Sequence, residues 1–237
     1  SSYRTLDEIG PDCRQFQEQG YDCVKFKCEL DDDVEAWCRA IAEHAPGMKV
    51  ILDPNQRWET AAAARQRVRA LEDVGNVLLL EDPIPHWRLQ DYADLRSYSA
   101  IPIVLHVSLP YVFQGQRSYD AINALEHRAV DGFNFNGGLS AFQQLDAIAR
   151  TANLPIWHGS EIDLGILEAS YVHKAAAARS CVWPSDIFGR MIREHDLLET
   201  PLVFEPPHVR VPDGPGLGIA LDRAAIEKYK TSEYELA

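Results

Sequence analysis

The chain has 237 residues, of which 46% are hydrophobic and 25% are charged, which is the composition of an ordinary globular protein. Its formal net charge of −13 argues against a nucleic-acid partner, because an acidic surface repels phosphates. No apolar run approaches the roughly 20 residues that a membrane span needs, and the N-terminus lacks the apolar core of a signal peptide. The five cysteines form no CxxC pair, which favours reduced thiols and a cytoplasmic location.

Apolar runs typical of strands alternate along the chain with amphipathic runs typical of helices. In chain order we expect a helix over 2–19, a strand over 22–28, a helix over 31–44, a strand over 48–53, a helix over 59–74, a strand over 77–81, a helix over 89–99, a strand over 101–107, a helix over 118–128, a strand over 132–136, a helix over 139–151, a strand over 154–158 and a helix over 163–179. A seventh strand candidate, 181–187, and a proline-rich tail follow.

This alternation predicts an α/β fold with a parallel sheet and helical crossovers. Seven strand candidates suit a (β/α) barrel over residues 1–203, with 204–237 as a C-terminal tail that packs back on the barrel or on a cap. The alternative is an open doubly wound sheet. No GxGxxG or P-loop motif opens a helix, which weakens that alternative.

Each predicted strand ends in a polar residue, and these residues recur every 24 to 28 positions. In a parallel barrel the carboxyl ends of the strands meet at one mouth, where active sites lie. We therefore expect a ring of side chains there: Lys25 and Lys27, Asp53, Glu81, His106, Asn134 and Asn136, and His158.

Two chemical features stand out in this ring. Asp53 and Glu81, on adjacent strand ends, would repel each other unless a cation lies between them, and Mg²⁺ suits such oxygen ligands. Lys25 and Lys27 lie two residues apart and so point to the same side of their strand. Two close ammonium groups favour deprotonation of one, which can then act as a general base. The alternatives are carboxylate–lysine pairs and solvated lysines.

The segments GYDCVKFK, VILDPNQRW, LLLEDPIP, IPIVLHVS, VDGFNFNGGLS and VPDGPGLGIALD, in this order, resemble the mandelate racemase and muconate lactonizing group of the enolase superfamily. The resemblance implies a modified (β/α)8 TIM-type barrel, a Mg²⁺ ion on three strand-end ligands, and abstraction of the proton alpha to a substrate carboxylate. The family's N-terminal capping domain and first barrel strand have no counterpart in this chain. We therefore expect the native protein to be longer, by a cap of roughly 100 residues or more and one further strand, and this piece alone to be poorly soluble and inactive.

The resemblance also implies roles for individual residues. Asp53 and Glu81 match the first two metal ligands, and Lys27 matches the base, with Lys25 tuning it. Asn55 stands where family members often have a polar mouth residue.

Three positions depart from the family pattern. His106 replaces the usual acid as the third metal ligand, and it either ligates the metal or only lines the pocket. Asn136 replaces a lysine base on the sixth strand. His158 is a candidate acid or base without its usual aspartate partner. The candidate substrate-binding residues are Asn55, Asn134, Asn136, Glu161 and Asp163.

The expected function is a Mg²⁺-dependent enzyme for a small carboxylic acid, with a dehydratase of a hydroxy acid or sugar acid as the leading interpretation. Lys27 takes the alpha proton, and His158 helps the hydroxide to leave. The alternatives are a racemase, epimerase or cycloisomerase of the same family, a non-catalytic barrel that binds an acid, and a Schiff-base lyase that uses Lys27. We also expect a homo-oligomer, with neither nucleic acid nor a membrane as a partner.

Overall fold

Strands and helices alternate through most of the chain. The structure is a computed structural model that describes residues 5–107, 117–160 and 162–231. Among the helices in these ranges, none is long and apolar enough to span a membrane.

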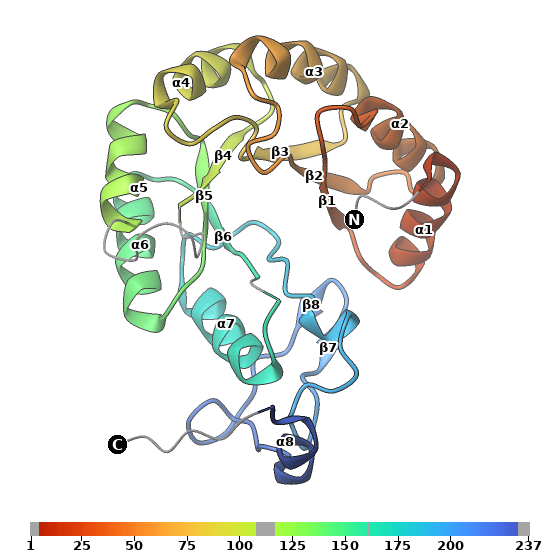
Figure 1. Cartoon of the computed structure of the whole chain (residues 1–237), viewed down its shortest axis with the longest axis vertical. Helices are drawn as coiled ribbons and strands as arrows, with labels where there is room; N and C mark the ends of the chain where they lie inside the picture. The colour runs from red at the N-terminus through yellow and green to blue at the C-terminus, as the bar shows by residue number, and fades with distance from the viewer. Residues whose placement is uncertain (1–4, 108–116, 161, 232–237) are drawn as a thin grey trace.

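Six parallel strands form one sheet in the order of the chain. The sheet curls, and the helices that connect the strands lie around its outer side (Figure 1). The strands are β1 (Cys23–Lys27), β2 (Lys49–Asp53), β3 (Val77–Glu81), β4 (Ile103–His106), β5 (Gly132–Phe135) and β6 (Ile156–His158). The helices are α1 (Leu6–Glu18), α2 (Val34–His44), α3 (Ala61–Val74), α4 (Leu89–Tyr98), α5 (Arg117–Glu126), α6 (Leu139–Thr151) and α7 (Gly165–Ala177).

Local signals explain where several helices begin and end. The side chain of Asp33 accepts a hydrogen bond from the backbone of Ala36 at the start of α2, and Thr60 caps α3 in the same way through Ala63. Gly75 ends α3 in the left-handed conformation that glycine adopts without steric cost. The predicted order of helices and strands is confirmed from α1 through α7.

The curled sheet separates two apolar layers. The large core lies between the sheet and the helices. A small cluster of Ile51, Leu79, Val104 and Trp157 fills the inner side of the sheet. In the β1–β2 pairing, Lys25 is opposite Ile51 and Lys27 is opposite Asp53, so both lysines share the inner side. The alternation of side chains along each strand therefore places the small apolar cluster and the polar strand ends on the same inner side of the sheet.

The seventh predicted strand, 181–187, is wrong. Among the described residues it contributes a single parallel bridge from Cys181 to Ile156 beside β6. Pro184 lacks a backbone N–H and interrupts any longer ladder. The described strands therefore form a curled half-barrel with edges at β1 and β6 rather than a closed ring.

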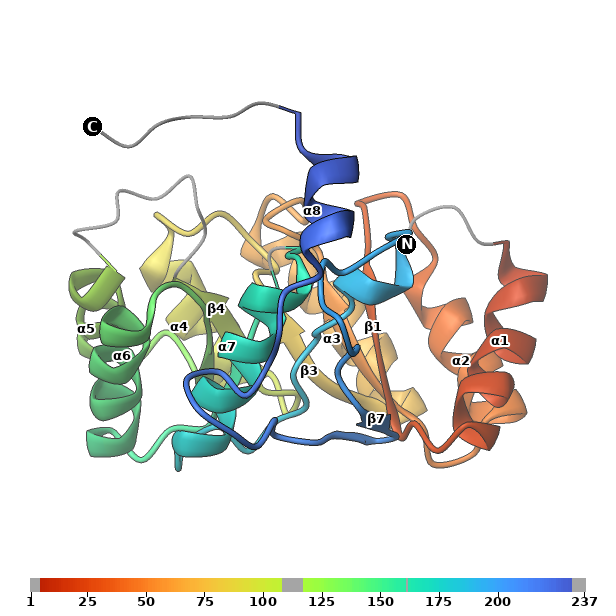
Figure 2. The same ribbon diagram turned by 90° about the horizontal axis from the view of Figure 1, so that it is seen from below.

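The last quarter of the chain packs against the end of the half-barrel. It holds a short 3-10 helix, η2 (Gly189–Met191), an antiparallel pair, β7 (Phe204–Glu205) and β8 (His208–Val209), and a last helix, α8 (Arg223–Tyr229). His173 on α7 lies 3.1 Å from the carbonyl oxygen of Leu217, which ties this segment to the helix layer. Seen from the side, α8 stands out from the ring of helices (Figure 2).

Candidate active site

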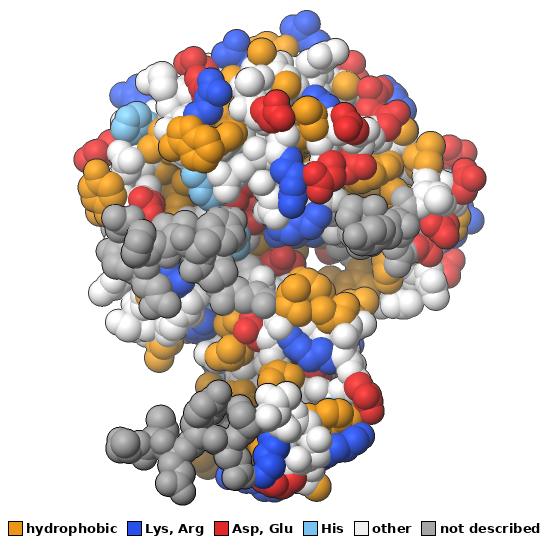
Figure 3. All heavy atoms as spheres, viewed as in Figure 1, with side chains coloured by type: hydrophobic (Ala, Val, Ile, Leu, Met, Phe, Trp, Pro, Cys, Tyr) orange, Lys and Arg blue, Asp and Glu red, His pale blue; other side chains and the backbone are white. Residues whose placement is uncertain are grey.

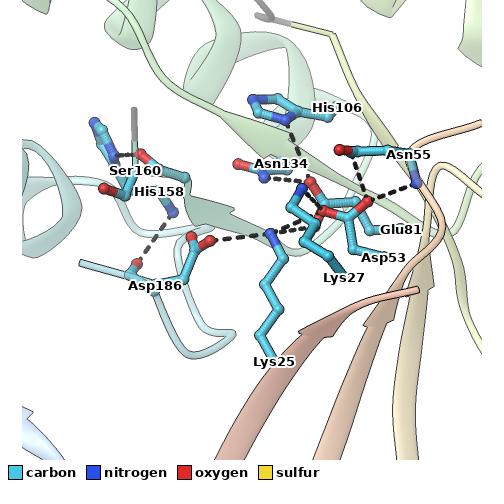
Figure 4. A network of polar contacts seen from close by, with 12 residues as sticks. Lys25, Lys27, Asp53, Asn55, Glu81, His106, Asn134, His158, Ser160 and Asp186 are labelled. Atoms are coloured by element: carbon cyan, nitrogen blue, oxygen red, sulfur yellow. Dashed lines mark hydrogen bonds and ion pairs between the residues drawn. The ribbon is translucent and has the colours of Figure 1, made fainter. Parts of the chain in front are cut away.

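The ends of β1, β2 and β3 bring two lysines and two carboxylates together. Lys25 Nζ lies 2.5 Å from Glu81 Oε2 and 3.2 Å from Asp53 Oδ2. Lys27 Nζ donates a hydrogen bond to Asp53 Oδ2. Asp53 and Glu81 are fully buried, whereas the side chain of Lys27 is 47% exposed. Figure 4 shows these side chains pointing toward one another, and the predicted convergence is present.

The charges of this cluster depend on one another. Burial and the neighbouring Glu81 raise the pKa of Asp53 to about 7. Burial would also raise the pKa of Glu81, but Lys25 and a hydrogen bond with His106 outweigh it and hold this pKa well below its usual range. Burial opposes the charged form of Lys25, yet Asp186, Glu81 and Asp53 hold its pKa well above the usual value. Lys25 therefore remains charged, which leaves Lys27 as the lysine of the pair that was predicted to act as the base.

Two asparagines hold the carboxylates in place. The backbone N–H and the Nδ2 group of Asn55 donate to Asp53 Oδ1 over 3.0 and 2.8 Å. Asn134 on β5 donates from Nδ2 to Glu81 Oε1 over 2.6 Å. Asn136, two residues further along, is also buried. Asn55 and Asn134 were predicted to bind substrate, but their amide groups bind the two carboxylates.

Ligand atoms of Glu81, Asp82 and His106 lie within 4.8 Å of one another, which is close enough for a shared metal ion. His106 Nδ1 lies 3.2 Å from Glu81 Oε1, while its Nε2 has no hydrogen-bond partner among the described residues. Asp82 Oδ1 already accepts the backbone N–H of His106 over 2.9 Å and lies 2.8 Å from His86 Nε2. Asp53 is connected to this group by Lys25, whose ammonium group contacts the carboxylates of both Asp53 and Glu81.

This donor set fits a divalent cation. Two buried carboxylates already share one cation, the Lys25 ammonium group, which lies 2.5 Å from Glu81 Oε2 and 3.2 Å from Asp53 Oδ2. Carboxylate oxygens suit Mg²⁺, whereas an imidazole nitrogen is more typical of a transition metal or zinc. The carboxylate of Glu81 therefore suits Mg²⁺ and the ring of His106 suits it less, while the group of ligand atoms within 4.8 Å contains Asp82 and not the predicted ligand Asp53.

Asp186 is a site residue that the sequence did not identify. Its Oδ2 lies 2.9 Å from Lys25 Nζ, opposite the two strand-end carboxylates. It follows the single bridge at Cys181, within the run that was predicted as a seventh strand. Asp186 does not end a regular strand, so the rule that strand ends point to the mouth did not apply to it. Only its position in the predicted seventh strand could have suggested that it belongs to the site.

His158 was predicted to face the mouth, and that placement is wrong. Its ring stacks 4.8 Å from Phe142 on α6 and 4.3 Å from Tyr171 on α7, measured between ring centroids. Its Nδ1 lies 2.7 Å from the carbonyl oxygen of Gly159. Burial and the neighbouring Lys174 lower its pKa to about 3. A fully buried, neutral ring on the helix side of β6 cannot reach a substrate at the inner side.

The last two predicted residues lie beyond β6. Asp163 accepts a hydrogen bond from the Tyr171 hydroxyl, so it belongs to the layer around His158. Glu161 falls outside the described residues. Figure 3 shows the open face in space-filling form, with basic and acidic side chains next to each other at its centre.

The fold agrees with the comparisons to known proteins. The chain belongs to the family described as enolase C-terminal domain-like, whose model matches residues 8–225. It is 28% identical over 184 residues to muconate cycloisomerase 1 of Rhodococcus opacus, covering 76% of this chain and 47% of that protein. It is 29% identical over 218 residues to a probable glucarate dehydratase of Streptomyces coelicolor, covering 90% of this chain and 48% of that protein.

A solved structure supports the fold. The muconate cycloisomerase of Pseudomonas fluorescens superimposes with a TM-score of 0.86 at 23% identity, covering 98% of this chain and 64% of that one. The chain spans about half the length of the curated relatives described above. These relatives carry the names of enzymes, and the superimposed structure confirms the expected barrel-like architecture.

Proposed function

We propose that the protein abstracts the proton alpha to the carboxylate of a small organic acid, with Lys27 as the base. The observation that carries this proposal is the meeting of Asp53 and Glu81 on Lys25, with Lys27 beside Asp53. Lys25 is held charged by three carboxylates, so Lys27 is the lysine of the pair that is available as a base. Its half-exposed side chain can approach a substrate at the mouth.

Asp53, Glu81 and His106 would hold a divalent cation, with Mg²⁺ as the first candidate. Mg²⁺ bound there would supply positive charge against the negative charge that develops on a carboxylate substrate. Asn55 and Asn134 orient the two carboxylates through the hydrogen bonds described above. Lys25 adds a fixed positive charge at the same point.

The finer proposal is dehydration of a hydroxy acid or sugar acid. The side chain at the sixth-strand position is Asn136, which cannot exchange a proton, and His158 is turned to the helix side. The described residues therefore offer a base on one face of the substrate, which favours elimination over racemisation. The similarity to a probable glucarate dehydratase supports this choice. The similarity to a muconate cycloisomerase makes cycloisomerisation the second candidate.

The test is a screen of hydroxy acids and sugar acids with the Mg²⁺-loaded protein in deuterated water. Proton NMR reports exchange of the alpha hydrogen, and a keto-acid assay reports dehydration. We expect exchange with at least one acid, keto-acid formation from the same acid, and loss of both with EDTA. Exchange without keto acid would favour the isomerase alternative, and turnover in EDTA would contradict the metal site.

A further inference from the structure

Arg117 is a buried cation that the proposed chemistry does not use. It is the first residue of α5, and it is only 8% exposed. Its Nε is buried without a hydrogen-bond partner, and no ion pair or hydrogen bond joins its guanidinium to a residue in the described ranges. A buried arginine without a partner is costly, so its retention requires a reason.

The guanidinium of Arg117 lies against the chain just beyond β5. A Cβ atom placed on Gly137 would be 2.0 Å from Arg117 Nη1, so the guanidinium needs a glycine at this position. Gly137 also has a φ of 91°, which glycine adopts readily. Lys174, only 4% exposed, donates a hydrogen bond from Nζ to the carbonyl oxygen of Gly137. Two buried cations therefore flank this turn.

The turn leads directly into the N-terminus of α6, a helix of 13 residues. Its N-cap is Gly138, which offers no side-chain acceptor, and its first turn contains no acid. The first backbone N–H groups of a helix lack partners within the helix and carry partial positive charge. A Cβ atom on Gly138 would meet no atom of the described part of the chain within 4 Å, so there is room beside this helix end. Such an end, next to an unpaired arginine, attracts an anion.

We propose that Arg117 and the N-terminus of α6 bind an oxyanion, a carboxylate or phosphate group, at the far end of the acid substrate. That the group belongs to the substrate rests on the proposed function. Asn134, which is bonded to Glu81, is three residues before Gly137. At about 3.3 Å per residue, Asn134 and Gly137 are at most about 10 Å apart. A small acid with an anionic group at each end can span this distance.

The first test measures anion binding to the metal-free chain in EDTA, without turnover. Inorganic phosphate should raise the melting temperature of the wild type, relative to chloride at equal ionic strength, and should bind in calorimetry. Arg117→Met should weaken phosphate binding at least about tenfold, because charge-assisted hydrogen bonds are lost. It should not lower the melting temperature without phosphate, since no partner is left unpaired. Unchanged phosphate binding in Arg117→Met, or none in the wild type, would overturn the site.

Two further variants make this test specific. Arg223→Met is the matched control, because Arg223 is also the first residue of a helix, α8, but is exposed. It should respond to phosphate as the wild type does. Gly138→Asp places a carboxylate at the N-cap of α6, where there is room for it. This folded variant should lose phosphate binding because its own carboxylate occupies the site, and retained binding would contradict the proposal.

A second arm identifies the source of the oxyanion. A six-carbon dicarboxylate should bind the Mg²⁺-loaded wild type at least about tenfold tighter than the matching monocarboxylate, and Arg117→Met should remove the difference. Phosphate binding through Arg117 with no preference for the dicarboxylate would overturn the assignment to the substrate. Lys27→Ala should leave phosphate binding unchanged. An inactive protein that still binds phosphate through Arg117 would therefore contradict the proposed function alone.

Discussion

The ammonium group of Lys25 lies 2.5 Å from Oε2 of Glu81, on the inner side of the curled sheet. The same group contacts Asp53 and Asp186, so one lysine balances three carboxylates. Two of these carboxylates are fully buried, and without a cation they would repel each other at close range. Lys25 is thus a structural charge as well as a part of the site.

Replacing Lys25 by methionine should destabilise the metal-free protein by about 3–5 kcal/mol, because buried carboxylates lose their partner. Urea denaturation in EDTA measures the change. Mg²⁺ should restore part of the loss, since it can take the place of the ammonium group between Asp53 and Glu81. Lys49→Met, at an exposed lysine on β2, is the control and should change little. A Lys25→Met protein as stable as the wild type in EDTA would contradict this account of the cluster.

The buried ring of His158 should make stability depend on pH. Its pKa in the folded protein is lowered to about 3 from an ordinary value of 6.5. Below pH 6.5 the unfolded chain binds a proton that the folded chain does not, so the free energy of unfolding falls as the pH drops from 6.5 toward 3. Between pH 7 and pH 5 this group should cost about 2 kcal/mol.

In His158→Gln, urea denaturation at these two pH values should show a smaller loss of stability by that amount. His208→Gln, at an exposed histidine, should keep the wild-type dependence. An unchanged pH dependence in His158→Gln would mean that the ring becomes protonated in the folded state.

Replacing His106 by aspartate should strengthen Mg²⁺ binding by roughly tenfold or more, because an oxygen ligand replaces a nitrogen ligand. Calorimetric titration with Mg²⁺ measures the affinity, and Zn²⁺ binding should weaken in the same variant. His127→Asp, which adds a carboxylate at an exposed position, controls for the change in net charge. If both variants bind Mg²⁺ equally well, His106 is not a ligand.

The lysines and carboxylates of the site could be predicted from the sequence because they lie on regular strands, to which two simple geometric rules apply. Parallel strands end at one edge, and alternate residues share a face, so Lys25, Lys27, Asp53 and Glu81 had to converge. The partners of the carboxylates were less visible. Asn55 and Asn134 have ordinary positions for pocket residues, and only the geometry shows that they bind Asp53 and Glu81.

The errors lie where the periodic signal ends. β6 has only three residues, so alternation could not decide whether Trp157 or His158 faces inward, and the larger apolar ring takes the inner side with Ile51, Leu79 and Val104. Asp186 lies in an irregular segment after Pro184, where no period exists to assign a direction. Arg117 lies in no sequence motif that predicts a site. It is noticed only in the structure, where it is buried and its Nε has no hydrogen-bond partner among the described residues.

The central proposal is tested most directly by hydrogen–deuterium exchange at the alpha carbon of an acid that the wild type converts. The exchange rate is compared between the wild type and Lys27→Ala with Mg²⁺ present. Lys27 contacts Asp53 but is not a proposed metal ligand, so calorimetry should show that the variant still binds Mg²⁺. The proposal predicts that exchange falls at least about a hundredfold in Lys27→Ala, the typical contribution of a general base. Exchange at the wild-type rate in a folded, Mg²⁺-bound Lys27→Ala protein would contradict it.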